Sequence, residues 1–410
     1  MDSFFKVTTL TRVLEYRSLF SPLEEQTIEL ADAVNRVFYQ DLVADDDLPP
    51  FSRSTMDGFA VRAASTFGAS EASPAFLTVK GEVPMGRAPE VAVGPGEAAR
   101  IPTGGMLPKG ADAVVMIEYA EILDEGTIEV TRSVAPGAHV VQRGEDFQKG
   151  EVVLGAGRRL RAQELGLLAA LGFGRVRVFR QPVVGIVSTG DEVVPIDETP
   201  GPGRIRDVNT YTLTGQLLEA GGLPVSYGIV PDRYDSLKAA LASALEGSDM
   251  VLISGGSSVG TRDYTLQVFS DLPDAEILVH GMTISPGKPT ILARIGKKPV
   301  WGLPGHVVSA MVVFTAVVRP FLEHIGGLGE AFASDALRIP AQMSRNVSSA
   351  QGRVEFIRVC LRQADGRLLA EPVLGKSGLI NTMVRADGLV AVGMDEEGLE
   401  KGEAVEVIPI

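Results

Sequence analysis

Residues 181–192 have the sequence Gln-Pro-Val-Val-Gly-Ile-Val-Ser-Thr-Gly-Asp-Glu, and this stretch decides the fold class. Its apolar run at residues 183–187 predicts a buried strand that ends in a Gly-rich loop. Strands are also predicted at residues 225–230, 250–253 and 276–279, and helices at residues 209–220 (capped by Asn209), 236–245, 264–269 and 307–324. Such alternation is typical of a parallel sheet wrapped by helices, so residues 177–327 are expected to form an α/β domain.

The chain on either side of this domain has different patterns. Residues 8–18 and 22–33 have helical spacing, and Ser21 followed by Glu24 resembles a helix capping box. Residues 47–143 predict an all-β module, with strands at residues 76–83, 97–101, 113–118 and 127–132. A short helix is expected at residues 162–171. The predicted chain is therefore an α/β multidomain protein, with a mixed linking domain (residues 1–46 and 144–176) and a small C-terminal β domain (residues 328–410).

Composition excludes several classes of protein. The 410 residues include 52 acidic and 38 basic side chains, a formal charge of −14, whereas a nucleic-acid partner requires a basic surface. The single cysteine, Cys360, excludes an intramolecular disulfide, and the four histidines lack the spacing of a zinc site. The N-terminus does not resemble a signal peptide, and the longest apolar stretch, residues 310–318, is too short to cross a membrane. We expect a cytoplasmic protein.

Three Gly-rich loops are expected beyond the carboxyl ends of the parallel strands, where open α/β sheets bind their ligands. They are residues 188–192, residues 254–260, and residues 301–305, which lead into the helix that carries Ser309. Backbone N–H groups in such loops bind phosphate or another oxyanion. The candidate binding residues are Ser188, Gly190, Ser254, Gly255, Gly256, Ser258, Pro304, Gly305 and Ser309. Tight turns with solvated side chains are the alternative, which fits one loop better than three at one sheet edge.

Charged residues near these loops supply candidate chemistry. Glu192 and Asp263 follow two of the Gly-rich turns and could share a hard cation such as Mg²⁺. Lys288 lies in a loop stiffened by Pro and Gly, which can aim its ammonium group at an anion, although a loop lysine is often only solvated. Asp57 lies in the β module with Thr103 downstream, and in isolation Asp57-Gly58 is more simply interpreted as a β-turn.

These residues together resemble a known family. The chain is similar from end to end to the MoeA-type molybdopterin molybdenumtransferases and to the E domains of fusion proteins such as gephyrin. The resemblance rests on motifs at residues 48–60, 100–104, 110–116, 188–192, 254–260 with Asp263, 286–289, 302–305 with Ser309, 352–356 and 386–389. It implies an elongated homodimer, in which residues 177–327 form a domain like MogA, the partner adenylyltransferase, and the C-terminal domain is barrel-like.

The resemblance also implies a reaction. Adenylylated molybdopterin and molybdate are the expected substrates, AMP is released, and molybdenum remains on the dithiolene sulfurs for acceptor molybdoenzymes or their chaperones. The residues implied as catalytic are Asp57, Thr103, Glu192, Asp232, Asp263 and Lys288, with Glu192 and Asp263 as the Mg²⁺ ligands. Asp57 and Thr103 are expected to enter the pocket from the second subunit. Lys288, Ser258 and Ser309 are expected to contact molybdate or phosphate.

Three positions depart from the family pattern. Ser285 replaces the usual Lys or Arg before Pro-Gly-Lys-Pro, His306-Val307 replaces Asn-Pro, and Ser257 replaces Val. Loss of a cation weakens anion binding, because charge-assisted hydrogen bonds are roughly twice as strong as neutral ones. One hypothesis is a paralogue that prefers another oxyanion such as tungstate, and the other is that His306 compensates for Ser285. A non-catalytic scaffold or anion-binding homologue is the remaining alternative.

Overall fold

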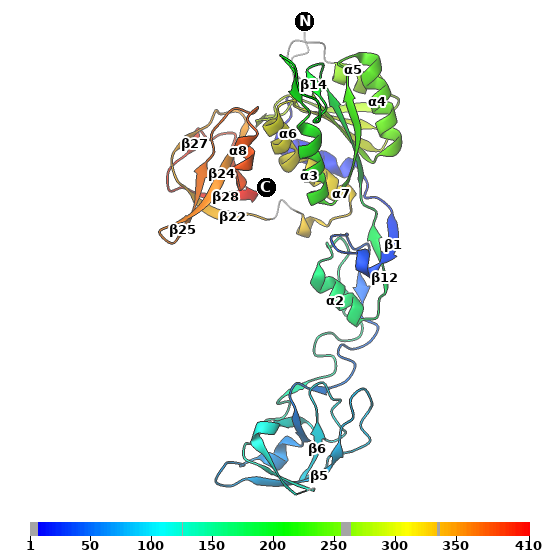
Figure 1. Ribbon diagram of the computed structural model, residues 1–410, viewed down its shortest axis with the longest axis vertical. Helices are drawn as coiled ribbons and strands as arrows, with labels where there is room; N and C mark the ends of the chain where they lie inside the picture. Colours follow the sequence, from blue (N-terminus) through cyan, green and yellow to red (C-terminus); the bar gives the residue numbers. More distant parts are fainter. Residues whose placement is uncertain (1–6, 125, 256–263, 334–336) are drawn as a thin grey trace. The chain divides into compact units, whose positions relative to one another are not determined.

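The computed structural model describes residues 7–124, 126–255, 264–333 and 337–410, and the chain divides into two compact units. The main unit contains residues 1–40, 156–169 and 173–410, and the β unit contains residues 41–155 and 170–172 (Figure 1). Buried apolar clusters lie within each unit, so each has the hydrophobic core that an independently folded body requires.

A six-stranded sheet organises the main unit, in the order β16-β13-β17-β21-β20-β18. Its strands are β13 (Val183–Thr189), β16 (Leu223–Val230), β17 (Met250–Ser254), β18 (Ala275–His280), β20 (Ile291–Ile295) and β21 (Lys298–Leu303). β13 pairs in parallel with β16 and β17, and β17 pairs in parallel with β21. β20 runs antiparallel to β21 and β18, because the short turn at Gly296 joins β20 directly to β21. The predicted parallel pairing is confirmed for β13, β16 and β17, whereas the fourth predicted strand, β18, pairs antiparallel with β20. β20 and β21 were not predicted.

Helices cover both faces of this sheet (Figure 1). They are α3 (Asn209–Ala220), α4 (Tyr234–Gly247), α5 (Tyr264–Ser270), α6 (Val307–Val313) and α7 (Arg319–Ile325). On one face, Ile186 of β13 shares a buried cluster with side chains of α3, α6 and α7. On the other face, Val187 of β13 shares a second cluster with α4 and α5. Both faces of β13 are buried, which explains why its sequence is almost continuously apolar.

A π-helical segment, Phe314–Val318, joins α6 to α7, so that helical structure runs from Val307 to Ile325. Among the residues that the structure describes, this helix alone is long and apolar enough to span a membrane. However, 72% of its apolar window is buried inside the unit. It therefore has the surroundings of a core helix.

The predicted helix at residues 22–33 is wrong. Apart from α1 (Leu10–Glu15), capped by the hydroxyl of Thr9, the N-terminal segment forms β1 (Glu25–Glu29) and a short 3-10 turn, Leu30–Asp32. β1 pairs antiparallel with β12 (Arg175–Phe179), and Glu29 and Arg175 form an ion pair of 3.1 Å across the two strands. A partner strand about 150 residues away, as the register shows, overrides the local helical pattern.

The C-terminal residues form a closed barrel that confirms the predicted barrel-like domain. Its strands are β22 (Ile339–Met343), β24 (Val354–Ala364), β25 (Arg367–Pro372), β26 (Gly388–Val392) and β28 (Ala404–Pro409). The sheet order runs β24-β25-β22-β28-β26, and β26 pairs back to β24. A short strand from the α/β chain, β19 (Ile284–Ser285), adds to the outer edge of β24. Phe356 and Leu389 of the barrel belong to the same buried cluster as α6, so the two domains share a core.

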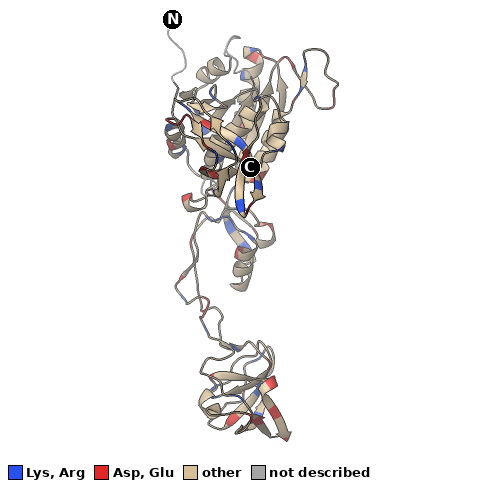
Figure 2. Cartoon of the chain, turned by 90° about the vertical axis from the view of Figure 1, so that its left-hand side faces the viewer, with Lys and Arg blue, Asp and Glu red and all other residues tan. Residues whose placement is uncertain are grey.

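The β unit contains a second six-stranded sheet, in the order β7-β4-β6-β5-β9-β8. Its strands are β4 (Gly58–Val61), β5 (Ala75–Glu82), β6 (Glu97–Ile101), β7 (Ala113–Met116), β8 (Ala120–Asp124) and β9 (Thr127–Val130). Apolar clusters lie on both sides of β4, around Phe59 and around Ala60. The predicted all-β character is confirmed. Acidic and basic residues are interspersed along both units in the view of Figure 2.

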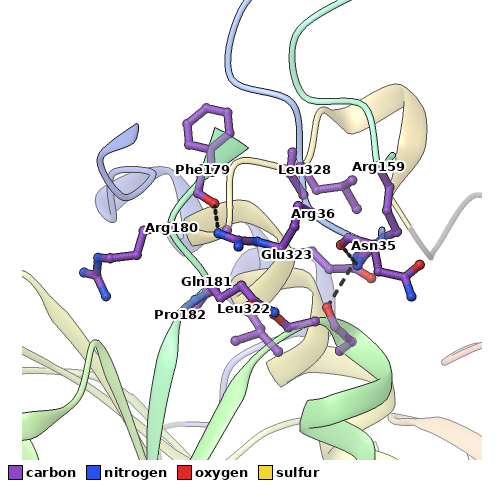
Figure 3. Close-up of a pocket in the computed structure, with 14 residues that line it drawn as sticks. Asn35, Arg36, Arg159, Phe179, Arg180, Gln181, Pro182, Leu322, Glu323 and Leu328 are labelled. Atoms are coloured by element: carbon purple, nitrogen blue, oxygen red, sulfur yellow. Dashed lines mark hydrogen bonds between the residues drawn. The ribbon is translucent and has the colours of Figure 1, made fainter. Parts of the chain in front are cut away.

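Two arginines join the N-terminal and linking segments of the main unit to its α/β domain (Figure 3). Arg159 donates to the backbone oxygens of Asn35 and Ala220, both at 3.3 Å, and Arg36 donates to the backbone oxygen of Phe179 at 3.0 Å. Ala220 ends α3, so Arg159 places positive charge at a helix C-terminus, where the helix dipole favours a cation. Gly221 follows with φ of 91°, and a Cβ there would lie 2.8 Å from Nη1 of Arg159. A side chain at position 221 would therefore have to displace the guanidinium of Arg159.

Glu164 generates a pH-dependent prediction about the helix α2 (Ala162–Ala170). Its buried carboxylate accepts hydrogen bonds from the guanidinium of Arg161 at 2.7 Å and from the backbone N–H of Arg161 at 2.9 Å, and pairs with Arg158 at 2.9 Å. The Arg161 side chain in particular lowers the pKa of Glu164 from 4.5 to about 2. Glu164→Gln is expected to reduce the free energy of unfolding by about 1–3 kcal/mol at pH 7, measured by urea denaturation.

A depressed carboxylate pKa stabilises the fold above the pKa of the unfolded chain, and this stability is lost as the pH falls through the folded pKa. The difference between wild type and Glu164→Gln should therefore be complete above pH 4.5 and shrink toward pH 2. Gln163→Ala, an exposed change on the same helix, should show no such pH dependence. A Glu164→Gln deficit that stays constant from pH 7 to pH 3 would contradict the assignment.

Candidate functional site

A cavity of about 760 Å³ lies at the carboxyl edge of the main sheet. The first and third predicted loops line it, as does the described start of the second loop. The predicted residues that line it are Ser188, Glu192, Ser254, Gly255, Lys288, Pro304, Gly305 and Ser309. Gly256, Ser258 and Asp263 lie outside the described residues, and so does Ser257. The cavity is large enough for a nucleotide-sized ligand.

A buried amide holds the second and third loops together. Nδ2 of Asn209 donates to the hydroxyl of Ser254 at 2.6 Å and to the backbone oxygen of Gly305 at 2.8 Å. The prediction that Asn209 caps α3 is wrong. Asp207 has that role, because its carboxylate accepts from the backbone N–H of Thr210 at 3.1 Å and from the Thr210 hydroxyl at 2.6 Å. The side chain of Asn209 is thereby left to join the loops.

The acidic groups of the first loop have different surroundings. Glu192 is exposed on the cavity wall, and its carboxylate lies against Gly190, where a Cβ would come within 2.9 Å of it. Asp232 does not itself line the cavity. It accepts from the Thr189 hydroxyl at 2.5 Å, and its backbone N–H donates to Asp191 at 3.3 Å. Asp232 therefore fixes the first loop to the end of β16.

Among the described residues, one lysine and one arginine line the cavity. Lys288 was predicted, and its loop packs tightly on α6, since a Cβ at Gly287 would lie 2.4 Å from Val313. Arg206 was missed. It lies on the two-residue strand β15 (Ile205–Arg206), which pairs in parallel with β14 (Val193–Val194). No sequence pattern indicated it, because the arginine follows a Pro- and Gly-rich stretch and lies outside the three predicted Gly-rich loops.

The C-terminal barrel domain contributes a further wall that the sequence did not reveal. Gly378 lines the cavity, and the adjacent Ser377 holds the start of α6. Nδ1 of His306 lies 2.9 Å from the Ser377 hydroxyl, and the backbone N–H of Val308 donates to the Ser377 carbonyl at 3.1 Å.

The departures from the family pattern therefore do not all meet at one place. His306 and Val307 line the cavity. Ser285 lies on β19 opposite Glu355 of the barrel and is not among the lining residues. The hypothesis that His306 replaces a cation at position 285 has to take into account that one ring nitrogen of His306 already faces Ser377.

In the β unit, the structure brings Asp57 and Thr103 together. The backbone N–H of Thr103 donates to Oδ1 of Asp57 at 2.6 Å. This bond, with a second one from the Thr103 hydroxyl and the charge of Arg100, lowers the pKa of Asp57. Both residues are exposed. A carboxylate with a lowered pKa thus lies on the surface beside the turn of residues 103–105.

Comparisons with known proteins agree along the whole chain. The family model described as MoeA N-terminal region (domain I and II) matches residues 8–172. The model described as "Probable molybdopterin binding domain" matches residues 185–324, and the MoeA C-terminal region (domain IV) matches residues 340–410.

Full-length relatives give the same result. The chain is 32% identical to the molybdopterin molybdenumtransferase of Bacillus subtilis over 94% of this chain and 90% of the relative. It is 31% identical to that of a Nostoc species, over 96% and 90%. The crystal structure of the molybdopterin biosynthesis MoeA protein from Pyrococcus horikoshii OT3 has a TM-score of 0.84 at 32% identity, with 99% of this chain and 100% of that chain covered.

Asn209 provides a test of how the cavity is built. Asn209→Ala removes two hydrogen bonds and leaves the buried hydroxyl of Ser254 and the part-buried backbone oxygen of Gly305 without this donor. We expect a loss of about 2–3 kcal/mol in the free energy of unfolding, measured by urea denaturation. Glu219→Ala, an exposed change on the same helix, should cost less than about 0.5 kcal/mol. Equal effects of the two substitutions would show that the amide does not hold the loops.

Proposed function

The chain belongs to the MoeA family of molybdenum cofactor biosynthesis proteins, and we propose that it is a molybdopterin molybdenumtransferase. In this reaction molybdate is inserted into adenylylated molybdopterin and AMP is released. The observation that carries the proposal is the cavity at the carboxyl edge of the sheet, where Glu192, Lys288 and Ser309 meet. Relatives of this name at 32% and 31% identity support it.

The residues of the cavity suit cleavage of a phosphoanhydride. Such cleavage depends mainly on positioning the phosphates and stabilising the negative charge that develops on them. Gly255 and Gly305 allow a close approach of backbone to the ligand, and Lys288 supplies positive charge to the same cavity. Molybdenum binds to the sulfurs of the pterin, so no protein thiol is required. Cys360 is consistent with this, because it lies on β24 and does not line the cavity.

Mg²⁺ is the proposed metal, with Glu192 and Asp263 as ligands. Mg²⁺ commonly binds through one or two carboxylates together with substrate phosphates. Across residues 7–124, 126–255, 264–333 and 337–410, no group of three or more His, Cys, Asp or Glu side chains is placed to hold a metal. Two described carboxylates line the cavity, and that of Asp207 already accepts hydrogen bonds from Thr210. Glu192 therefore fits an ion shared with a phosphorylated substrate better than a metal held by protein alone. When bound, Mg²⁺ supplies positive charge to the phosphates.

The second subunit of a homodimer is proposed to bring Asp57 and Thr103 to the same reaction. The Asp57–Thr103 pair is exposed and its carboxylate is held ionised, as a group awaiting a ligand would be. The proposed partners are a MogA-like adenylyltransferase, which supplies the substrate, and acceptor molybdoenzymes or their chaperones. We place the reaction in the cytoplasm, without nucleic acid or membrane partners.

Release of AMP tests the proposed reaction. Purified protein given adenylylated molybdopterin, Mg²⁺ and molybdate is expected to release AMP, quantified by chromatography. Glu192→Gln should reduce the rate by roughly 100-fold or more, because it removes a carboxylate that would hold the Mg²⁺, whose charge would stabilise the developing negative charge. Glu198→Ala, an exposed acidic residue on the following loop, is the matched control and should retain full activity.

Tungstate in place of molybdate distinguishes the alternatives. Faster AMP release with tungstate would support a paralogue with altered oxyanion preference. Absence of AMP with either oxyanion, from protein that is folded, would favour a non-catalytic scaffold and overturn the proposal.

Mixed dimers test whether Asp57 acts across subunits. Asp57→Asn and Glu192→Gln proteins are each expected to be nearly inactive. If each site takes Asp57 from one chain and Glu192 from the other, random exchange of subunits should restore roughly one quarter of wild-type activity, since half of the dimers then have one intact site. The measurement is AMP release after mixing and dialysis. No recovery, despite subunit exchange verified by mass spectrometry, would place both residues in a site formed by one chain.

A further inference from the structure

Arg206 occupies a backbone position that is fixed on both sides. The backbone N–H of Ile205 donates to the carbonyl of Glu192 at 2.8 Å, and that of Asp207 donates to the carbonyl of Val194 at 2.9 Å. The carboxylate of Asp207 in turn begins α3. Arg206 is therefore held between the loop that carries Glu192 and a helix that packs on the sheet, and its side chain lines the cavity.

The guanidinium of Arg206 is also oriented. Its Nε donates to the backbone oxygens of Ile196 at 3.0 Å and Glu198 at 3.1 Å. Both bonds are made by the Nε edge of the guanidinium, which faces the loop of residues 196–198. Within the part of the chain that the structure describes, no hydrogen bond or ion pair engages the two terminal amino groups. A guanidinium that is already oriented loses less entropy when it binds an anion.

Among the residues that the structure describes, Lys288 and Arg206 are the lysine and arginine side chains that line this cavity. The chain carries a formal charge of −14, and Ser285 stands where the family pattern has a cation. Lys288 has an interaction within the protein already, and Nδ1 of His306 faces Ser377. Glu192 adds negative charge to the same wall. A dianionic phosphate therefore needs a further cation, and Arg206 has the geometry to supply it.

We propose that Arg206 binds a phosphate oxygen of the anionic substrate through its terminal amino groups. This role rests on the proposed function, in which the substrate is a phosphoanhydride of a nucleotide. Planar guanidinium groups bind phosphate with two parallel hydrogen bonds, which adds direction as well as charge.

Titration of inorganic pyrophosphate and of AMP tests the proposal independently of turnover. By isothermal titration calorimetry, Arg206→Gln is expected to weaken binding of pyrophosphate by about 10- to 100-fold, the factor associated with hydrogen bonds to a charged group. Arg206→Lys should lose only part of this, because it retains a point charge. Arg204→Gln is the matched control: Arg204 is exposed on the same loop, 4.0 Å from Glu198, and does not line the cavity.

The conservative variant separates anion binding from a purely structural role. If Arg206 only tethers its loop, Lys and Gln should weaken binding equally, and the affinity of both should have the same salt dependence as wild type. That result, or wild-type protein that binds neither pyrophosphate nor AMP, overturns the proposal. In AMP-release assays Arg206→Gln should mainly raise KM.

Failure of this inference and failure of the proposed function give different results. If Arg206→Gln keeps wild-type turnover and KM, the role of Arg206 is rejected and the proposed function is unaffected. If the protein binds pyrophosphate through Arg206 but releases no AMP, the anion site is supported and the proposed reaction is rejected.

Discussion

The buried side-chain amide of Asn209 donates to Ser254 and Gly305, and the cavity depends on these two bonds. Ser254 ends β17, Gly305 follows β21, and Asn209 begins α3, so one small group connects two neighbouring strand ends with the helix that covers them. Buried oxygens of this kind are costly to leave without a donor. The Asn209 amide holds the second and third loops in place, so the glycines of these loops can face a ligand. Asp207 and Arg206 directly precede Val208 at the start of the same helix. The bond from Thr210 holds Asp207, and the pairing of β15 with β14 holds Arg206.

Much of this fold could be predicted from local patterns, and the failures have a common cause. Buried parallel strands such as β13 and β17 have apolar runs that few other structures produce, and the Gly-rich loops after them follow from the topology of α/β sheets. The helix predicted at residues 22–33 failed because β1 pairs with a strand far along the chain. β20 and β21 were missed because they form a tight antiparallel hairpin at Gly296, whereas the alternating pattern predicted only the strand at residues 276–279 before the helix at residues 307–324.

The site divides in the same way. Glu192, Lys288 and Ser309 could be predicted because each lies in or directly after a turn at the sheet edge. Arg206 and Ser377 could not, because each reaches the cavity through a contact between segments distant in the chain: a two-residue strand pair for Arg206, and the packing of a barrel loop on α6 for Ser377. Local sequence encodes which residues follow a strand. It does not encode which loop of another domain closes over them, and the position of His306 became interpretable only when Ser377 was seen beside it.

The shared core of the barrel and the α/β domain has a consequence for how the chain can be divided. β19 leaves the α/β segment to pair with β24, while Phe356 and Leu389 return from the barrel to the cluster around α6. The barrel has a buried cluster of its own, but these contacts tie it to the α/β domain across the sequence boundary near residue 328. A protease that cut the connection after α7 would leave two fragments that still contact each other, and recombination at that point would have to preserve the contacts of Phe356 and Leu389.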